Sequence, residues 1–201
     1  MPTLQIEVPD LPTSPEPPRK RWTRAECEML VSHGLLDYER VELVEGELIS
    51  KMGKKRPHSN AARSLYGWLL QVFSFKFVLN EESIDVAAAD NPINEPVPDI
   101  LVLNRKYSSF VSHNPGPTDI RLLVEVAHSS LTFDLTTKAA LYARAGIIEY
   151  WVLDVETRRL LVHRNPDSGR YRTIVGYQEH ESVAPLAAPE HEFPVSIAFS
   201  T

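Results

Sequence analysis

The chain has 201 residues, enough for one domain of ordinary size with a hydrophobic core. Hydrophobic residues make up 43% of it and charged residues 24%, which is typical of a soluble globular protein. The formal net charge of −6 argues against a protein that coats nucleic acid through bulk positive charge, although an enzyme that uses carboxylates can be acidic overall.

Cysteine content and hydropathy bear on the compartment. Cys27 is the only cysteine, so a disulfide framework is excluded and a reducing compartment, the cytoplasm, is expected. No run approaches the roughly 18 apolar residues of a membrane span, so we expect no membrane partner. The N-terminus also lacks the positive segment and apolar run of a signal peptide.

Proline marks the start of the chain as a tail. Six prolines fall within residues 1–18, and proline fits neither a helix interior nor a central strand. We expect an extended or disordered tail over 1–21, followed by a single domain over 22–201. Thr23 and Glu26 have the spacing of a capping box, which predicts a helix running to about residue 32.

The middle of the chain alternates between strand and helix patterns. Residues 41–49 alternate around Glu45-Gly46, which predicts a hairpin with a tight turn. Apolar spacing and chain breakers predict the remaining elements. Helices are expected over 60–77 and 134–145, the second capped by Asp134 and ended by Gly146, and strands over 77–88, 99–103, 120–127, 147–154, 160–164 and 171–176.

One strand–helix–strand unit defines the fold class. The strand at 120–127, the helix at 134–145 and the strand at 147–154 together predict a right-handed crossover between parallel strands. The outer hairpins should pair antiparallel, so the sheet is mixed. The predicted fold class is therefore α/β, with a mixed β-sheet flanked by helices.

Two carboxylates stand where a strand should be buried. Asp99 follows Pro98 and opens an apolar run, and Glu125 lies inside the apolar run 122–127. A buried carboxylate is costly unless it is paired or holds a cation. Two carboxylates on neighbouring strands with a nearby lysine could hold a divalent metal and act on a phosphodiester.

The same residues suggest how such chemistry would be divided. Hard cations such as Mg²⁺ prefer oxygen ligands, which Asp99, Glu125 and the backbone carbonyl of Val126 could supply. Lys138 could orient the attacking water or stabilise the pentavalent phosphate. Asp134 lies four residues before Lys138, on the same helix face.

A basic segment precedes the first long helix. Residues 51–63 contain five lysine or arginine residues and no acid, with His58 as a further candidate cation. This segment is either a solvated lysine-rich loop or an edge that contacts phosphates. In the second case Lys54, Lys55 and Arg56 would lie near a nucleic-acid backbone.

Motifs spread along the chain carry a family resemblance. They are Glu42-Leu43-Val44-Glu45-Gly46-Glu47, His58, Pro98-Asp99, Leu123-Val124-Glu125-Val126 with Ser129-Ser130, the helix pattern Asp134, Lys138, Tyr142 and Gly146, and Glu149-Tyr150-Trp151 with Asp154. Together they resemble the Uma2 family, formerly a domain of unknown function, within the PD-(D/E)XK nuclease superfamily. The resemblance covers residues 22–195.

The resemblance implies a restriction-endonuclease-like mixed sheet with a metal site at its edge. It implies an endonuclease that hydrolyses DNA phosphodiester bonds with Mg²⁺ or Mn²⁺. Asp99 would match the first metal carboxylate and Glu125 the second. Ala127 stands where the superfamily usually has lysine, so Lys138 would be a lysine supplied instead from the following helix. Further carboxylates and a histidine are candidates for accessory roles: Glu42, Glu47, His58 and Asp134.

Two other functions remain open on the sequence alone. Ala127 and the acidic composition fit a non-catalytic nucleic-acid-binding or regulatory module on the same fold. The apolar run 147–153 could instead drive formation of a homodimer, although such a run is more typical of a central strand.

Overall fold

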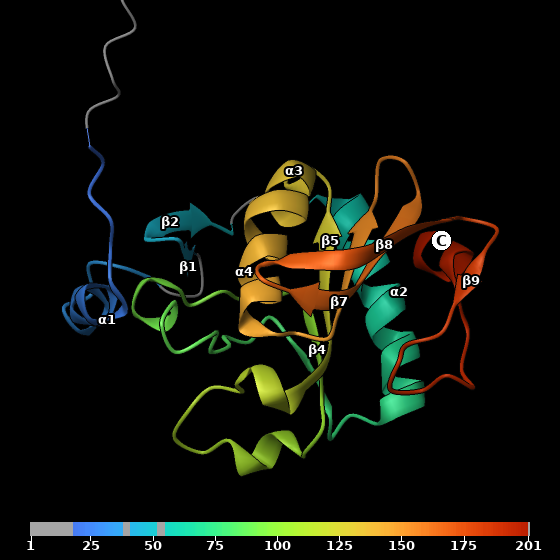
Figure 1. The fold of residues 1–201 in the computed structure, drawn as a ribbon, viewed down its shortest axis with the longest axis horizontal. Coiled ribbons are helices and arrows are strands. Elements are labelled where there is room, and N and C mark those ends of the chain that lie inside the picture. The colour runs from blue at the N-terminus through green and yellow to red at the C-terminus, as the bar shows by residue number, and fades with distance from the viewer. Residues whose placement is uncertain (1–17, 38–40, 52–54, 201) are drawn as a thin grey trace, which may run out of the picture.

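A computed structural model describes residues 18–37, 41–51 and 55–200 (Figure 1). The predicted tail therefore lies outside the described residues over 1–17, as does Lys54. Within the described ranges no helix is long and apolar enough to cross a membrane.

A six-stranded mixed sheet forms the centre of the fold, in the order β3-β4-β5-β6-β7-β8. β5 and β6 pair in parallel and every other neighbouring pair is antiparallel, so the predicted mixed α/β sheet is confirmed. The strands are β3 (Val78–Asn80), β4 (Ile100–Leu103), β5 (Ile120–Ala127), β6 (Glu149–Asp154), β7 (Arg159–Asp167) and β8 (Arg170–Gln178).

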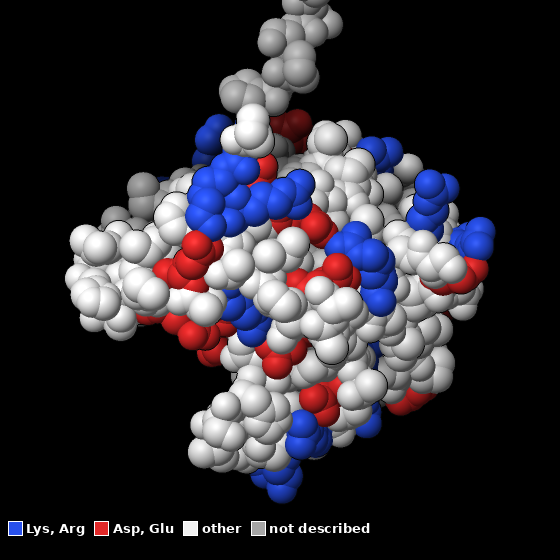
Figure 2. All heavy atoms as spheres, turned by 60° about the vertical axis from the view of Figure 1, so that its left-hand side comes forward, with Lys and Arg blue, Asp and Glu red and all other residues white. Residues whose placement is uncertain are grey.

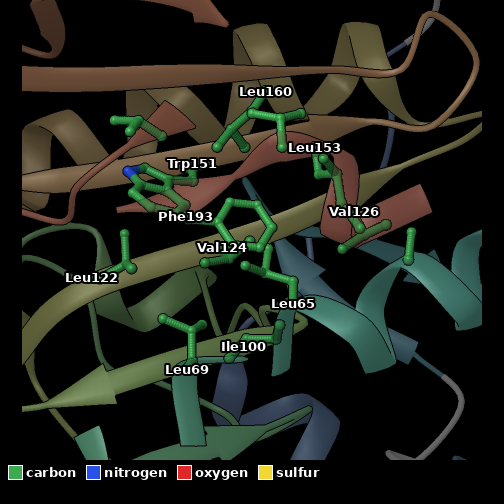
Figure 3. Close-up of a cluster of buried hydrophobic side chains, with 14 of the residues drawn as sticks. Leu65, Leu69, Ile100, Leu122, Val124, Val126, Trp151, Leu153, Leu160 and Phe193 are labelled. Atoms are coloured by element: carbon green, nitrogen blue, oxygen red, sulfur yellow. The ribbon is translucent and has the colours of Figure 1, made fainter. Parts of the chain in front are cut away.

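Helices cover both faces of this sheet (Figure 1). On one face α2 (Arg56–Phe73) packs with the C-terminal helix η6 (Val195–Phe199). Figure 3 shows Leu65 and Leu69 of α2 beside Ile100 and Val124 of the sheet. The opposite face is covered by the helical crossover between β5 and β6, which buries a second apolar cluster. Two buried layers therefore flank the sheet, as amphipathic helices require.

The N-terminal elements follow their local sequence signals. α1 (Arg24–Ser32) begins at the Thr23–Glu26 capping box, as predicted. β1 (Val41–Val44) and β2 (Glu47–Ser50) form the predicted hairpin, and both residues of its turn have positive φ. Short 3₁₀ turns complete the connections: η2 (Asn91–Ile93), η3 (Tyr107–Ser109) and η4 (Pro117–Asp119).

Two predicted boundaries around α2 and β3 are wrong. The helix predicted over 60–77 spans 56–73, because Pro57 is tolerated in a first helical turn and Ser74 leaves the helix with φ +68°. The strand predicted over 77–88 pairs only over 78–80. Glu81 then turns the chain with φ +56°, and the segment beyond it runs beside prolines that cannot donate to a ladder.

The helix predicted over 134–145 begins earlier and contains a wider turn. It consists of α3 (Leu131–Phe133), the π-helical segment η5 (Asp134–Lys138) and α4 (Ala139–Ala145). The prediction that Asp134 caps the helix is wrong, because its N–H already donates to the Ser130 carbonyl inside the helix. Gly146 ends α4 with φ +81°, as predicted.

The C-terminal part is attached to the sheet through a buried ion pair. Glu149 of β6 is fully buried and accepts hydrogen bonds from Arg164 Nε at 2.8 Å and from Trp151 Nε1 at 3.0 Å. Its second carboxylate oxygen accepts the Leu186 N–H at 2.7 Å. The segment that follows carries β9 (Ser182–Val183) and β10 (Phe193–Pro194), which pair antiparallel.

The central position of β6 bears on the homodimer hypothesis. All six residues of this strand are buried between β5 and β7. Residues 149–153 of the apolar run therefore form a core strand, while Ile148 before it is exposed. The homodimer stays a prediction.

Replacing Arg164 by Met should destabilise the fold by about 3 kcal/mol or more, because the buried Glu149 carboxylate would lose its cation. Urea denaturation followed by circular dichroism measures this loss. The matched control is Arg172→Met, because Arg172 pairs with Asp167 in solvent and should leave the midpoint unchanged. Equal stabilities for the two variants would contradict this assignment.

Candidate functional site

A cavity of about 160 Å³ lies where β1, α2, β5 and the crossover helix meet. Most of the residues singled out from the sequence line it together. They are Glu42, Lys55, His58, Asp99, Glu125, Val126, Asp134 and Lys138. Glu47 and Arg56 are exposed and are not among the lining residues, and Lys54 lies outside the described ranges.

Strand register explains why the two central carboxylates meet. β4 and β5 pair with Ile100 opposite Val124, so the next position places Asp99 beside Glu125. Alternation along each strand points these two side chains to the face covered by the crossover helix. Glu125 is only 4% exposed, and the side chain of Asp99 is 11% exposed.

Lys138 joins two carboxylates from distant parts of the chain. Its Nζ lies 2.8 Å from Glu42 Oε1 and 2.9 Å from Glu125 Oε1. All three side chains are buried. Tyr142 also donates its hydroxyl proton to Glu125 Oε1, at 2.9 Å. A single carboxylate oxygen of Glu125 is therefore held by an ammonium and a phenol.

The crossover helix presents two side chains to this carboxylate. Lys138 and Tyr142 are four residues apart, on one helix face, and both reach Glu125. A π-helical turn over 134–138 lies directly before this face. π-Helical turns inside α-helices are frequently found at functional sites.

Asp99 is held from two directions. Its Oδ2 accepts the backbone N–H of Val126 at 2.8 Å and lies 3.4 Å from His58 Nε2. The other ring nitrogen of His58 is buried and has no hydrogen-bond partner among the described residues. His58 therefore connects α2 to the carboxylate at the start of β4.

Burial dominates the electrostatics of the pocket. It raises the pKa of Glu125 well above the usual range, and the Lys138 charge only partly offsets this. Burial likewise raises the pKa of Asp134 to about 6. For Lys138 burial lowers the pKa, but the carboxylates of Glu125 and Glu42 outweigh it and hold the pKa above its usual value.

The donor set suits a hard divalent cation. Within the described ranges, no group of three or more His, Cys, Asp or Glu side chains converges in a way that could hold a metal. Mg²⁺, however, often binds through one or two carboxylates and keeps several waters. Asp99 and Glu125 supply two adjacent carboxylates in a pocket whose buried part holds more acids than lysines.

Two side chains at this site were not assigned a role from the sequence. Tyr142 was visible as a continuation of the Asp134–Lys138 face, but its hydrogen bond to Glu125 depends on the tertiary fold. His128 lines the pocket three residues after Glu125, just beyond β5. A histidine directly after a strand carries no local signal for such a position.

The fold and the site define a restriction-endonuclease-like α/β protein with a carboxylate–lysine pocket. The model of the Uma2 family, described as "Putative restriction endonuclease", matches residues 33–196. The chain belongs to this family, which confirms the resemblance found in the sequence.

Structural comparison agrees on the fold. A crystal structure described as a "putative nuclease belonging to DUF820" from Anabaena variabilis ATCC 29413 is similar, with a TM-score of 0.62. The two share 17% sequence identity, over 84% of this chain and 94% of the other. No functionally curated protein matches the chain.

Asp134→Asn should change the pH dependence of stability. The pKa of Asp134 is about 6 in the folded protein against an ordinary 3.8, so the native state binds the extra proton and loses stability as pH rises between these values. The variant removes this loss. Its stability relative to wild type should be about 2 kcal/mol more favourable at about pH 7.5 than at about pH 4.5.

Urea denaturation of both proteins at the two pH values measures this difference. The Ser130 hydrogen bond is one of the contributions to the Asp134 pKa, so the expected difference already includes it. A stability difference that stays the same at both pH values would show that Asp134 is not a buried carboxylate of raised pKa.

Proposed function

We propose that this protein is a metal-dependent endonuclease that hydrolyses phosphodiester bonds in DNA. The observation that carries the proposal is the Lys138 ammonium, 2.9 Å from Glu125, in a pocket that also contains Asp99. Phosphodiester hydrolysis needs a cation on the phosphate, a positioned water and neutralisation of developing charge. Two carboxylates and a lysine in one pocket meet these needs.

Asp99 and Glu125 would hold the cation, with the backbone carbonyl of Val126 as a third ligand. Mg²⁺ or Mn²⁺, when bound, supplies neutralisation of phosphate charge and lowers the pKa of water. The Val126 N–H donates to Asp99 and so fixes the carboxylate that faces it. Tyr142 fixes Glu125 in the same way from the helix.

Lys138 would donate hydrogen bonds to the phosphate or to the attacking water. Its position on the helix replaces the lysine that the superfamily usually has two residues after the second carboxylate. Ala127 occupies that place here. It is fully buried and packs in the apolar cluster under the crossover helix. A lysine supplied from the helix reaches Glu125 without placing a charge in that cluster.

Local rather than overall charge would bring DNA to the pocket. The face seen in Figure 2 carries both signs, with basic side chains gathered on its upper part. Lys55 lines the pocket and Arg56 is exposed next to it at the start of α2. Lysine and arginine contacts to phosphate supply most sequence-independent affinity for DNA.

The comparisons support the same chemistry. The family is described as "Putative restriction endonuclease" and the structural relative as a "putative nuclease". At 17% identity the second comparison supports the fold, and the reaction rests on the residues in the pocket.

Calorimetric titration with Mn²⁺ and Mg²⁺, beside cleavage of supercoiled plasmid, tests the proposal. Wild type should bind the ion and cut the plasmid. Asp99→Asn and Glu125→Gln should lose ion binding and at least about 100-fold in cleavage, since a catalytic metal ion contributes several kcal/mol. Lys138→Met should lose cleavage as well, because it removes the ammonium proposed to act on the phosphate or the water.

Glu47→Gln is the matched control, because this exposed hairpin carboxylate does not line the pocket. It should bind metal and cut plasmid like wild type. Folded wild type that neither binds the ions nor cuts any form of DNA would overturn the proposal. DNA binding that is unaffected by Asp99→Asn, without cleavage, would establish the non-catalytic module instead.

A further inference from the structure

A second cavity of about 370 Å³ adjoins the first. The two share His58 and Asp99, so they lie on either side of the first metal carboxylate. α2 forms one wall of the second cavity, and the end of β3 with Asn80 and Glu81 forms the other. Its volume lies in the range of small-ligand sites.

One face of α2 lines this cavity. Ser59, Ala62, Arg63 and Tyr66 all contribute, at the i, i+3, i+4 and i+7 spacing that places residues on a single helix face. His58 and Tyr66 are about 12 Å apart along the helix axis, given a rise of 1.5 Å per residue. At 3.4 Å per stacked nucleotide of one strand, this face spans about three to four nucleotides.

Arg63 offers a charge to a phosphate. It is exposed and makes no ion pair with any acid in the described part of the chain. Arginine presents a planar fork of donors that matches phosphate oxygens. The exposed Lys55, just before the start of α2, lines the first cavity, so each cavity has one basic side chain at its wall.

Tyr66 offers an aromatic surface. It is partly buried, packs against the apolar core beneath α2 and also lines the cavity. Asn80 and Glu81 on the opposite wall present an amide and a carboxylate, which suit the edges of a base better than a phosphate. The cavity thus has a cationic side, an aromatic surface and a polar wall.

We propose that the second cavity binds an unpaired nucleotide next to the scissile phosphate, with its phosphate on Arg63 and its base against Tyr66. This inference rests on the proposed nuclease function, because it places the scissile phosphate at Asp99 and Glu125. A base inside a duplex cannot reach Tyr66, so the substrate class is DNA with a single-stranded nucleotide at the cleavage position.

Fluorescence anisotropy with a labelled single-stranded oligonucleotide of about 12 nucleotides tests this inference, with Ca²⁺ present so that binding is measured apart from cleavage. Tyr66→Leu keeps an apolar side chain against the core but removes stacking, and should weaken binding about tenfold. Tyr66→Phe should bind like wild type. Arg63→Gln should weaken binding and lower the slope of log affinity against log salt by about 0.7.

Arg121→Gln is the matched control, since Arg121 is exposed at the opposite end of β5 and lines neither cavity. It should leave the affinity unchanged. A blunt duplex of the same sequence should bind wild type more weakly than the single strand, and Tyr66→Leu should reduce that preference.

Wild-type affinity in both Tyr66→Leu and Arg63→Gln, or no binding of single strands by wild type, would overturn the inference. Plasmid cleavage that persists in these variants would then leave the proposed nuclease standing. Conversely, loss of single-strand binding in the two variants supports the nucleotide site even if wild type does not cut DNA. Failure of the nucleotide site and failure of the nuclease proposal are therefore distinguishable.

Discussion

The buried ammonium of Lys138 is the interaction on which the arrangement of the pocket depends. It lies between Glu42 of the β1–β2 hairpin and Glu125 of the central sheet, and it comes from the crossover helix. Without it, two carboxylates would be buried with no cation, at a cost of several kcal/mol. The hairpin is not hydrogen-bonded into the six-stranded sheet, so this ion pair helps to hold it over the strand ends.

The central strands and their carboxylates could be predicted because the signal is local. β5 was predicted with its observed limits from an uninterrupted apolar run, and Glu125 stood out as a charge inside that run. Asp99 was visible in the same way before β4. The partnership of Glu42 with Lys138 could not be predicted, because the hairpin and the helix meet only in the folded chain and a hairpin glutamate is usually exposed.

The local sequence predicted the wrong backbone conformation at two places where tertiary contacts determine it. Asp134 has the chemistry of a helix cap, yet it lies inside the helix, where its carbonyl accepts the hydroxyl of the buried Tyr150. The segment after β3 alternates like a strand, but its neighbours include Pro96 and Pro98, which lack N–H donors. In both places the backbone makes other hydrogen bonds than the local pattern predicts. Asp134 donates its N–H to the Ser130 carbonyl, and Ile84 donates its N–H to the Pro96 carbonyl.

The charge balance of the pocket links cation and substrate. Its buried part holds Glu42, Glu125 and Asp134 against the single ammonium of Lys138, and Asp99 adds a further acid beside His58. A phosphate entering this field would be repelled unless positive charge enters with it. Lys138 is already shared between two carboxylates. Under the proposed function, the added charge would come from a bound cation and from the exposed basic residues of α2. The acids proposed to hold the cation and the helix proposed to contact the DNA strand would therefore act together around Asp99, which lines both cavities.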